Sequence, residues 1–170
     1  MVEKIRKHFL KSKDAQTLLN QISEKLKVSS EILKTKTNIE IVEMESAKIY
    51  LIGGKPLLAM LENTIFPTLA FQEFFALASK IVVDMGAIPY VCKGANIMAP
   101  GIVRLEGEFR EGDFVFVVDE KHGKPIAVVQ ALLGYEEAKS AKHGAVAKNV
   151  HYVGDETWDL IKKLQGLKRN

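Results

Sequence analysis

The strongest constraint on the fold is a series of short apolar segments, separated by turns, in the second half of the chain. The segment IVRLEGEF (102–109) alternates, with Val103, Leu105 and Phe109 on one face and charged residues on the other. Two further segments, FVFVVDE and IAVVQALLGY, are almost wholly apolar, as strands inside a sheet are. The turns REGD and KHGKP separate them at distances typical of antiparallel hairpins. The pattern predicts five or six short strands that close into a compact barrel, because closure removes exposed strand edges.

The first part of the chain predicts a smaller module of a helix and three strands. Asp14 is expected to cap a helix whose apolar residues recur at helical spacing: Ala15, Leu18, Leu19, Ile22 and Leu26. Strands are expected in NIEIVEM, AKIYLIG and KPLLAMLE, with GGKP (53–56) as the hairpin turn between the last two. GGK also suggests a P-loop, but Pro56 stands where a Ser or Thr is needed, so the turn is favoured. Residues 64–79 are expected to form a short helix or a packed connector.

The octapeptide GANIMAPG (94–101) lies between two apolar runs, and the run before it, KIVVDMGAIPYVCKG, predicts one or two strands. The octapeptide itself predicts about one helical turn, with Gly94 and Gly101 free to adopt unusual backbone angles. Ile97 and Met98 are expected to anchor the turn beneath. Two interpretations stay open: exposed backbone N–H groups that a phosphate or base approaches, or a corner of purely structural use.

The last part of the chain predicts two helices around a final strand. EEAKSAKH has acidic residues at its start and basic residues at its end, which matches a helix dipole, and Gly144 fits a left-handed stop. The strand AVAKNVHYV follows. Asp155 is then expected to cap a helix with Trp158, Ile161 and Leu164 inward and Lys162, Lys163 and Lys168 outward.

Charge is unevenly distributed along the chain. Residues 1–37 carry nine Lys/Arg and four Asp/Glu, and residues 161–170 carry four Lys/Arg and no acid. Residues 38–160 carry eleven basic and seventeen acidic residues, so this middle part is net acidic. The pattern permits binding of a polyanion at selected places, although solvated helix faces explain it equally well.

Candidate catalytic and metal-binding residues are few. Cys92 is the only cysteine and lies in an apolar run, where a buried thiol is expected, so neither a disulfide nor a zinc cluster is predicted. The four histidines, His8, His122, His143 and His151, have no metal-ligand spacing. No Gly-x-Ser-x-Gly elbow or paired-carboxylate motif stands out, and the apolar runs are too short for a membrane span. We expect no cofactor, no membrane contact and a reducing, cytoplasmic location.

Three separated motifs resemble the PUA domain: VVDMGAIPYVCKGANIMAPGI, GDFVFVVDEKHGKPIAVVQALL and HGAVAKNVHYVGDETWDL. PUA domains are small pseudo-barrels of RNA-modifying enzymes and translation factors that typically bind structured RNA. With IFPTL (65–69) before this region, the chain resembles the MCT-1/Tma20 family of stand-alone, translation-associated PUA proteins, in an archaeal type. The resemblance implies an α+β fold: an N-terminal module at 1–78, a PUA pseudo-β-barrel at 79–154, and a helix at 155–170 packing on the PUA domain.

The resemblance also implies an RNA surface, formed by the small helix at Gly94–Gly101 and the segment from Lys142 to Val146. Lys93, Arg104, Lys142 and Lys148 are expected to neutralise phosphates, and Asn96 and His143 to hydrogen-bond sugar or base edges. The expected RNA-binding residues are Lys93, Gly94, Ala95, Asn96, Met98, Gly101, Arg104, Lys142, His143, Gly144, Ala145 and Lys148. Solvated surface lysines and an Asn96 that caps its own turn are the alternatives.

The function implied by the resemblance is non-enzymatic RNA binding in translation. The expected partner is structured RNA, tRNA or rRNA, with a ribosomal subunit or a translation factor bound through the N-terminal module. The alternative is an accessory RNA-binding subunit of a separately encoded tRNA- or rRNA-modifying enzyme. A small-molecule enzyme built on a PUA-like barrel is the third, least favoured class.

Overall fold

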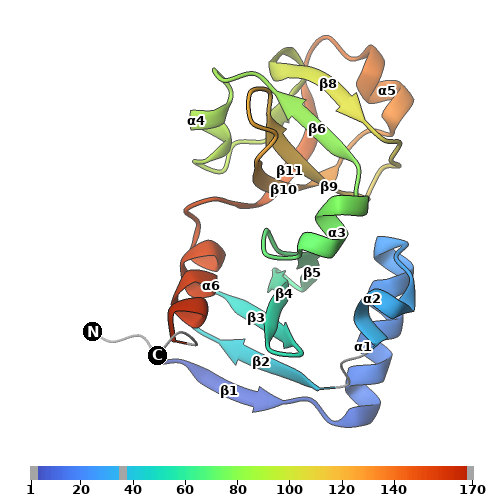
Figure 1. The fold of residues 1–170 in the computed structure, drawn as a ribbon. Helices are drawn as coiled ribbons and strands as arrows, with labels where there is room; N and C mark the ends of the chain where they lie inside the picture. The colour runs from blue at the N-terminus through green and yellow to red at the C-terminus, as the bar shows by residue number, and fades with distance from the viewer. Residues whose placement is uncertain (1–3, 35–37, 168–170) are drawn as a thin grey trace.

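The computed structural model describes residues 4–34 and 38–167. The ends of the expected modules, 1–3 and 168–170 with Lys168, lie outside the described residues, and so does the segment 35–37. Two sheets organise the chain, one of five strands and one of six. Figure 1 shows the N-terminal sheet at one end of an elongated molecule and the second sheet at the other. The mixed α+β fold with a small module before the barrel is confirmed.

The N-terminal sheet is an antiparallel meander in the order β1-β2-β3-β4-β5. Its strands are β1 (Arg6–Phe9), β2 (Ile39–Glu43), β3 (Lys48–Ile52), β4 (Lys55–Leu61) and β5 (Thr64–Pro67). The sequence predicts β2, β3 and β4 but not the edge strands β1 and β5. The turn at GGKP is confirmed, because Gly53 and Gly54 join β3 to β4 with φ of 59° and 80°.

Three helices accompany this sheet: α1 (Ser12–Leu26), α2 (Ser30–Lys34) and α3 (Gln72–Leu77). The predicted apolar face of α1 is buried. The predicted cap is wrong, because α1 begins at Ser12 after Lys11 and Asp14 lies in its first turn. An acidic side chain there still interacts favourably with the helix dipole.

The second sheet has the order β7-β11-β10-β9-β6-β8. Its strands are β6 (Lys80–Val83), β7 (Ile97–Met98), β8 (Ile102–Glu106), β9 (Phe114–Asp119), β10 (Pro125–Ala131) and β11 (Ala145–Tyr152). All pairs are antiparallel except β6 with β9. Valines of β9, β10 and β11 fill the interior: Val115, Val117, Val129 and Val146.

The octapeptide is the corner that makes this sheet curl. The two edge strands, β7 and β8, are separated in the chain only by the 3-10 turn η1 (Ala99–Gly101). Three residues span at most about 10 Å, so opposite edges of a six-stranded sheet meet there. The two edge strands are not paired with each other, so the sheet curls into a half-barrel and does not close fully as the sequence predicts. The structural interpretation of the octapeptide accounts for its position.

The small helix lies one segment earlier than the sequence predicts. α4 (Ile88–Val91) precedes the octapeptide, where a second strand was expected, and Cys92 ends this helix instead of lying in a strand. The octapeptide itself forms β7 and η1. Ile97 is an anchor, at 2% exposure, but Met98 is 48% exposed and is not.

The alternation predicted for 102–109 is also partly wrong. Val103 is 46% exposed, while Phe109 is buried beyond the end of β8. As an edge strand, β8 presents more of its surface to water than a central strand does. The helix α5 (Tyr135–Ser140) ends before Lys142, and Gly144, with φ of 82°, turns the chain into β11.

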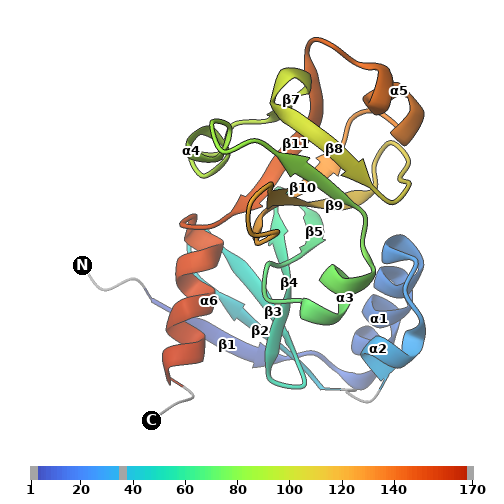
Figure 2. The ribbon, with the colours of Figure 1, turned by 45° about the horizontal axis from the view of Figure 1, so that its top comes forward.

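The buried residues form two hydrophobic clusters, and the two sheets meet at the first of them, which Phe114, Phe116 and Val128 of the second sheet join. Phe116 of β9 packs against Phe74 and Phe75 of the α3 region, with ring centroids 5.6 Å and 5.1 Å away. The helix α6 (Glu156–Leu167) contacts both β3 and β11, and its buried side chains join the core of the N-terminal sheet. It therefore packs along the N-terminal sheet, with its start next to the end of β11, as Figure 2 shows, and not on the PUA domain as expected.

Asp155 holds the start of α6. Its carboxylate accepts hydrogen bonds from the backbone N–H of Trp158, at 2.7 Å, and of Tyr152, at 2.9 Å. The buried ring of His151 lies 2.9 Å from the same carboxylate through Nδ1. The predicted N-cap is confirmed, and the same side chain also ties β11 to the helix.

Candidate nucleic-acid interface

The two segments expected to form the RNA surface lie side by side. β7 pairs with the start of β11, with Met98 opposite Ala145 and Ile97 opposite Ala147. The backbone N–H of Ala99 also donates to the carbonyl of Gly144 at 2.9 Å. Backbone pairing therefore makes one continuous surface from the octapeptide and the α5–β11 loop.

Asn149 of β11 fixes the chain between α4 and β7. Its side-chain amide donates to the carbonyls of Val91 and Ala95, each at 3.0 Å. Its backbone N–H donates to the side-chain oxygen of Asn96 at 3.1 Å. That oxygen of Asn96 therefore binds β11, so it neither caps its own turn nor points freely to a ligand. The sequence analysis missed Asn149, whose partners lie more than 50 residues away.

Gly94 and Gly144 have similar backbone angles and different surroundings. Both have a positive φ, 95° and 82°, which residues other than glycine rarely adopt. A Cβ at Gly94 would lie 3.2 Å from the ring of Tyr152, whereas a Cβ at Gly144 would meet nothing within 4 Å. Gly94 thus serves packing, while Gly144 leaves open space at the surface.

Gly101 also has a packing role. Its carbonyl accepts a hydrogen bond from the backbone N–H of Asp84 at 3.0 Å. An added Cβ would lie 3.3 Å from the Cβ of Ala87. This glycine brings the end of the corner against the segment between β6 and α4.

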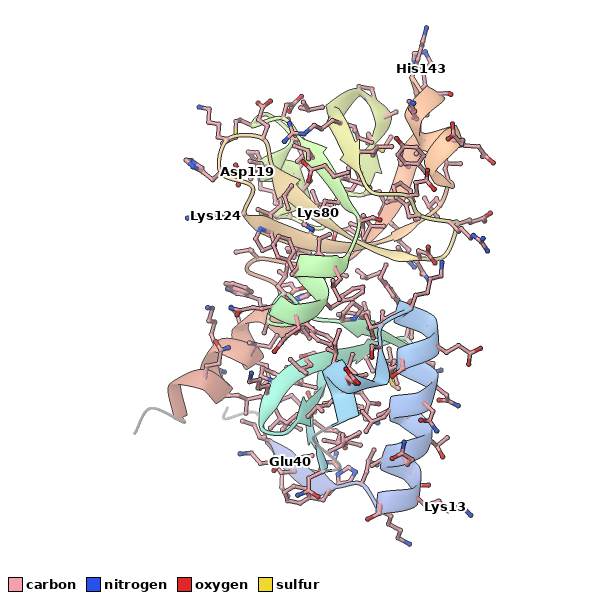
Figure 3. The ribbon with its side chains drawn as sticks, turned by 45° about the vertical axis from the view of Figure 1, so that its right-hand side comes forward. Lys13, Glu40, Lys80, Asp119, Lys124 and His143 are labelled. Carbon is pink, nitrogen blue, oxygen red and sulfur yellow. The ribbon has the colours of Figure 1, made fainter. Side chains whose placement is uncertain are left out.

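The expected basic residues Lys93, Lys142 and Lys148 are all exposed. Lys93 follows α4, Lys142 lies in the α5–β11 loop, and Lys148 lies on β11 opposite Gln130. Figure 3 shows His143 projecting from the tip of that loop, at the end of the molecule farthest from the N-terminal sheet. None of the three lysines forms an ion pair with another described residue.

Arg104 is the expected residue that the fold separates from this group. It lies on β8 and forms an exposed ion pair with Glu106, with 3.1 Å between the nitrogen and the carboxylate oxygen. It lines a shallow groove of about 320 Å³ against α5, together with Tyr135 and Lys139. Arg104 therefore belongs to the border of the surface.

Tyr90 of α4 is a surface residue that the sequence analysis missed. It is 68% exposed and, with the half-exposed Met98, lines an almost wholly apolar cavity of about 240 Å³. Ala87, Val91 and Ile97 line the same cavity. The signal in the sequence is Ile-Pro-Tyr-Val, since proline is favoured in the first turn of a helix. An apolar hollow beside an exposed ring is suited to an unstacked base.

The remaining candidate chemistries find no support in the arrangement. Burial raises the pKa of the Cys92 thiol, which keeps it protonated and a poor nucleophile at neutral pH. Within residues 4–34 and 38–167, no three His, Cys, Asp or Glu side chains gather as a metal site. In the same ranges, no helix has both the length and the apolar character needed to cross a bilayer.

Two family models match the chain. The PUA domain matches residues 79–153, and a domain of unknown function, DUF1947, matches residues 6–72. The first match contains the second sheet and the surface described above. The second match contains the five-stranded sheet and α1.

Proteins similar over nearly the whole chain include an uncharacterised protein of Methanocaldococcus jannaschii, 38% identical over 91% of this chain and 96% of that protein. Translation machinery-associated protein 20 of Eremothecium gossypii is 30% identical over 89% of this chain and 86% of its own. A hypothetical protein of Pyrococcus horikoshii has a similar crystal structure, with a TM-score of 0.75, 31% identity, and 92% and 99% of the two chains covered.

The likeness therefore extends through both modules, and the expectation drawn from the sequence motifs is confirmed. The chain belongs to the Tma20/MCT-1 family of PUA-domain proteins.

Proposed function

We propose that this protein binds structured RNA of the translation machinery, tRNA or rRNA, and catalyses no reaction. The contact surface, here named the PUA face, comprises Lys93, Met98, Lys142, His143, Gly144 and Lys148 with Tyr90 beside them. The observation that carries the proposal is the pairing of β7 with β11, which unites the octapeptide and the α5–β11 loop. The family's PUA domain and its translation-associated relatives support it.

Each part of the PUA face has a physical task in this proposal. Lys93, Lys142 and Lys148 neutralise phosphates and release counterions, which makes binding dependent on salt. Gly144 has open space beside it, so an RNA backbone approaches the main chain there. Tyr90 and Met98 receive an unstacked base at the apolar cavity.

The division of the chain is part of the same proposal. Residues 79–154 supply the PUA face, and residues 1–78 supply contacts to a ribosomal subunit or a translation factor. The helix α6 follows the PUA domain in the chain, and its buried side chains join the hydrophobic cluster of the N-terminal sheet. Phe114, Phe116 and Val128 of the PUA domain join the same cluster, which connects the two parts.

The test compares two double charge reversals in the same domain. Lys142→Glu with Lys148→Glu changes the PUA face, and Lys121→Glu with Lys124→Glu changes two lysines in the β9–β10 turn that are also exposed. Binding is measured by sedimentation with purified small ribosomal subunits and by gel shift with total tRNA. We expect the first variant to bind at least tenfold more weakly, with the salt slope reduced by about 2, and the second to bind nearly as the wild type.

The outcomes separate the candidate functions. Binding to ribosomal subunits or to tRNA, weakened only by the PUA-face variant, supports the proposal. Wild-type protein that binds neither RNA contradicts it. Binding to tRNA only in the presence of a separately encoded modifying enzyme favours the accessory-subunit alternative.

A further inference from the structure

A second basic surface lies at the opposite end of the molecule from the PUA face. It comprises the edge strand β1 and the start of α1, whose side chains are all exposed, and we name it the β1 surface: Arg6, Lys7, His8, Phe9, Lys11 and Lys13. Figure 3 shows Lys13 projecting at this end and His143 projecting at the other. The two surfaces therefore face different parts of a large partner.

The β1 surface carries a net positive charge. None of its four lysine and arginine side chains forms an ion pair with another described residue. Glu43 lies opposite Arg6 in the sheet, but its carboxylate is bonded to Lys48 at 3.3 Å. Arg6 also lines a hollow with Glu45 and Glu62, so acids balance its charge. The acidic neighbours of Lys7, Lys11 and Lys13 are Glu40, opposite Phe9, and Asp14, in the first turn of α1. Three cations against two acids leave this part of the surface net positive.

Phe9 distinguishes this surface from an ordinary solvated strand edge. Charged side chains on an edge strand protect it against pairing with other chains, which accounts for Arg6 and Lys7. The same protection does not require Phe9, which is 66% exposed, nor Lys11 and Lys13, which lie beyond the strand. An exposed aromatic ring between cations is the arrangement on which single-stranded nucleic acid stacks.

The chain's other basic segment lies nearby. In Figures 1 and 2 the last turns of α6 lie near the start of β1, and α6 contains the exposed Lys162 and Lys163. Two segments far apart in the sequence thus add positive charge to the same end of the N-terminal module.

We infer that the β1 surface is a second RNA contact, in which Lys7, Lys11 and Lys13 hold a phosphate backbone and the Phe9 ring stacks on an unpaired base. This inference rests on the proposed function only for the kind of partner. A molecule with an RNA contact at each end bridges two segments of a folded RNA, so small-subunit rRNA suits it better than a short hairpin.

The experiment measures binding of the full chain to deproteinised small-subunit rRNA at several salt concentrations. Phe9→Ala removes the ring, and Leu77→Ala, at the same 66% exposure, is its matched control. Lys7→Gln with Lys11→Gln removes two charges, and Lys121→Gln with Lys124→Gln is the matched control. All these side chains are exposed, and an unchanged urea midpoint verifies that each variant folds.

We expect Phe9→Ala to weaken binding about fivefold or more, and the Lys7/Lys11 variant to lower the salt slope by about 2. The controls should bind like the wild type. If both β1-surface variants bind like the wild type, the inference is wrong and the surface is solvated or meets a protein.

The Lys142→Glu/Lys148→Glu variant keeps the two claims distinguishable. If it alone loses affinity, the PUA face binds RNA and the β1 surface does not. If the β1-surface variants alone lose affinity, the inference stands and the PUA face is the wrong site. If the PUA-face variant and the β1-surface variants all lose affinity, and a variant that combines the two sets of substitutions loses more, both contacts are supported.

Discussion

Gly94→Ala and Gly144→Ala test whether these two glycines serve packing or ligand approach. Their φ angles, 95° and 82°, are close, so the backbone cost of adding a Cβ is similar at both positions. A residue other than glycine in the left-handed region costs about 1–2 kcal/mol. The free energy of unfolding should therefore fall by about that amount in both variants.

Gly94→Ala carries a further cost. Its Cβ would lie 3.2 Å from Cε1 and 3.4 Å from the hydroxyl oxygen of Tyr152, and overpacking of this kind adds about 1–3 kcal/mol. We therefore expect losses of about 2–5 kcal/mol for Gly94→Ala and about 1–2 kcal/mol for Gly144→Ala, measured by urea unfolding. In a Tyr152→Leu background the difference between the two should shrink.

RNA binding should rank the same two variants in the opposite order. Gly144→Ala places a methyl group in the open space beside the α5–β11 loop and should weaken RNA binding at concentrations where the protein is folded. Gly94→Ala should bind nearly normally once folded. Equal losses of stability would refute the packing role of Gly94, and unchanged RNA affinity in Gly144→Ala would refute approach of RNA to that loop.

Three further predictions concern stability. Asp155→Ala removes the cap of α6 and the partner of buried His151, and should lower the free energy of unfolding by about 1–3 kcal/mol, measured by thermal unfolding. Asp155→Asn keeps a capping oxygen and should lose less in the same measurement. The backbone N–H groups of His122 and Lys124 lower the pKa of Asp119 below its ordinary 3.8. The Asp119 carboxylate therefore stabilises the fold above pH 3.8, and this stabilisation is lost as the pH falls through the lower pKa of the folded state. The urea midpoints of the wild type and Asp119→Asn should converge over that pH range, and a constant difference between them would contradict this. Glu62 and Asn63 form a two-residue hairpin turn with φ of 49° and 64°. Glu62→Asn with Asn63→Gly should therefore raise the free energy of unfolding by about 0.5–1 kcal/mol, and a free energy below that of the wild type would contradict the turn assignment.

Features with a clear local period were predictable from the sequence. The buried face of α1 repeats at helical spacing, and β2, β3, β4, β9 and β10 are apolar runs, of which all but β2 adjoin a glycine-containing turn. The cap at Asp155 was predictable for the same reason, since the preference for aspartate there is local.

Short elements that depend on distant partners were not predictable. β7 has two residues and exists because it pairs with β11, and β1 has exposed side chains throughout and is a strand because it pairs with β2. α4 has four residues inside an apolar run, too few to show a helical period.

The candidate site was likewise predictable from the sequence only in part. The sequence motifs predict Lys93, Lys142 and Lys148 as surface residues, and the fold exposes them around the pairing of β7 with β11. The use of Asn96 and Gly94 within the fold depends on Asn149 and Tyr152, both more than 50 residues later in the chain. Such contacts have no signal in a local window.

The central claim is that RNA binds across β7 and the α5–β11 loop. Its most direct test is amide hydrogen exchange of the full chain with and without small ribosomal subunits, and with and without total tRNA. The account predicts slower exchange in residues 93–101 and 142–148 when the RNA partner is bound. Slower exchange elsewhere, with no change in either segment, would contradict it.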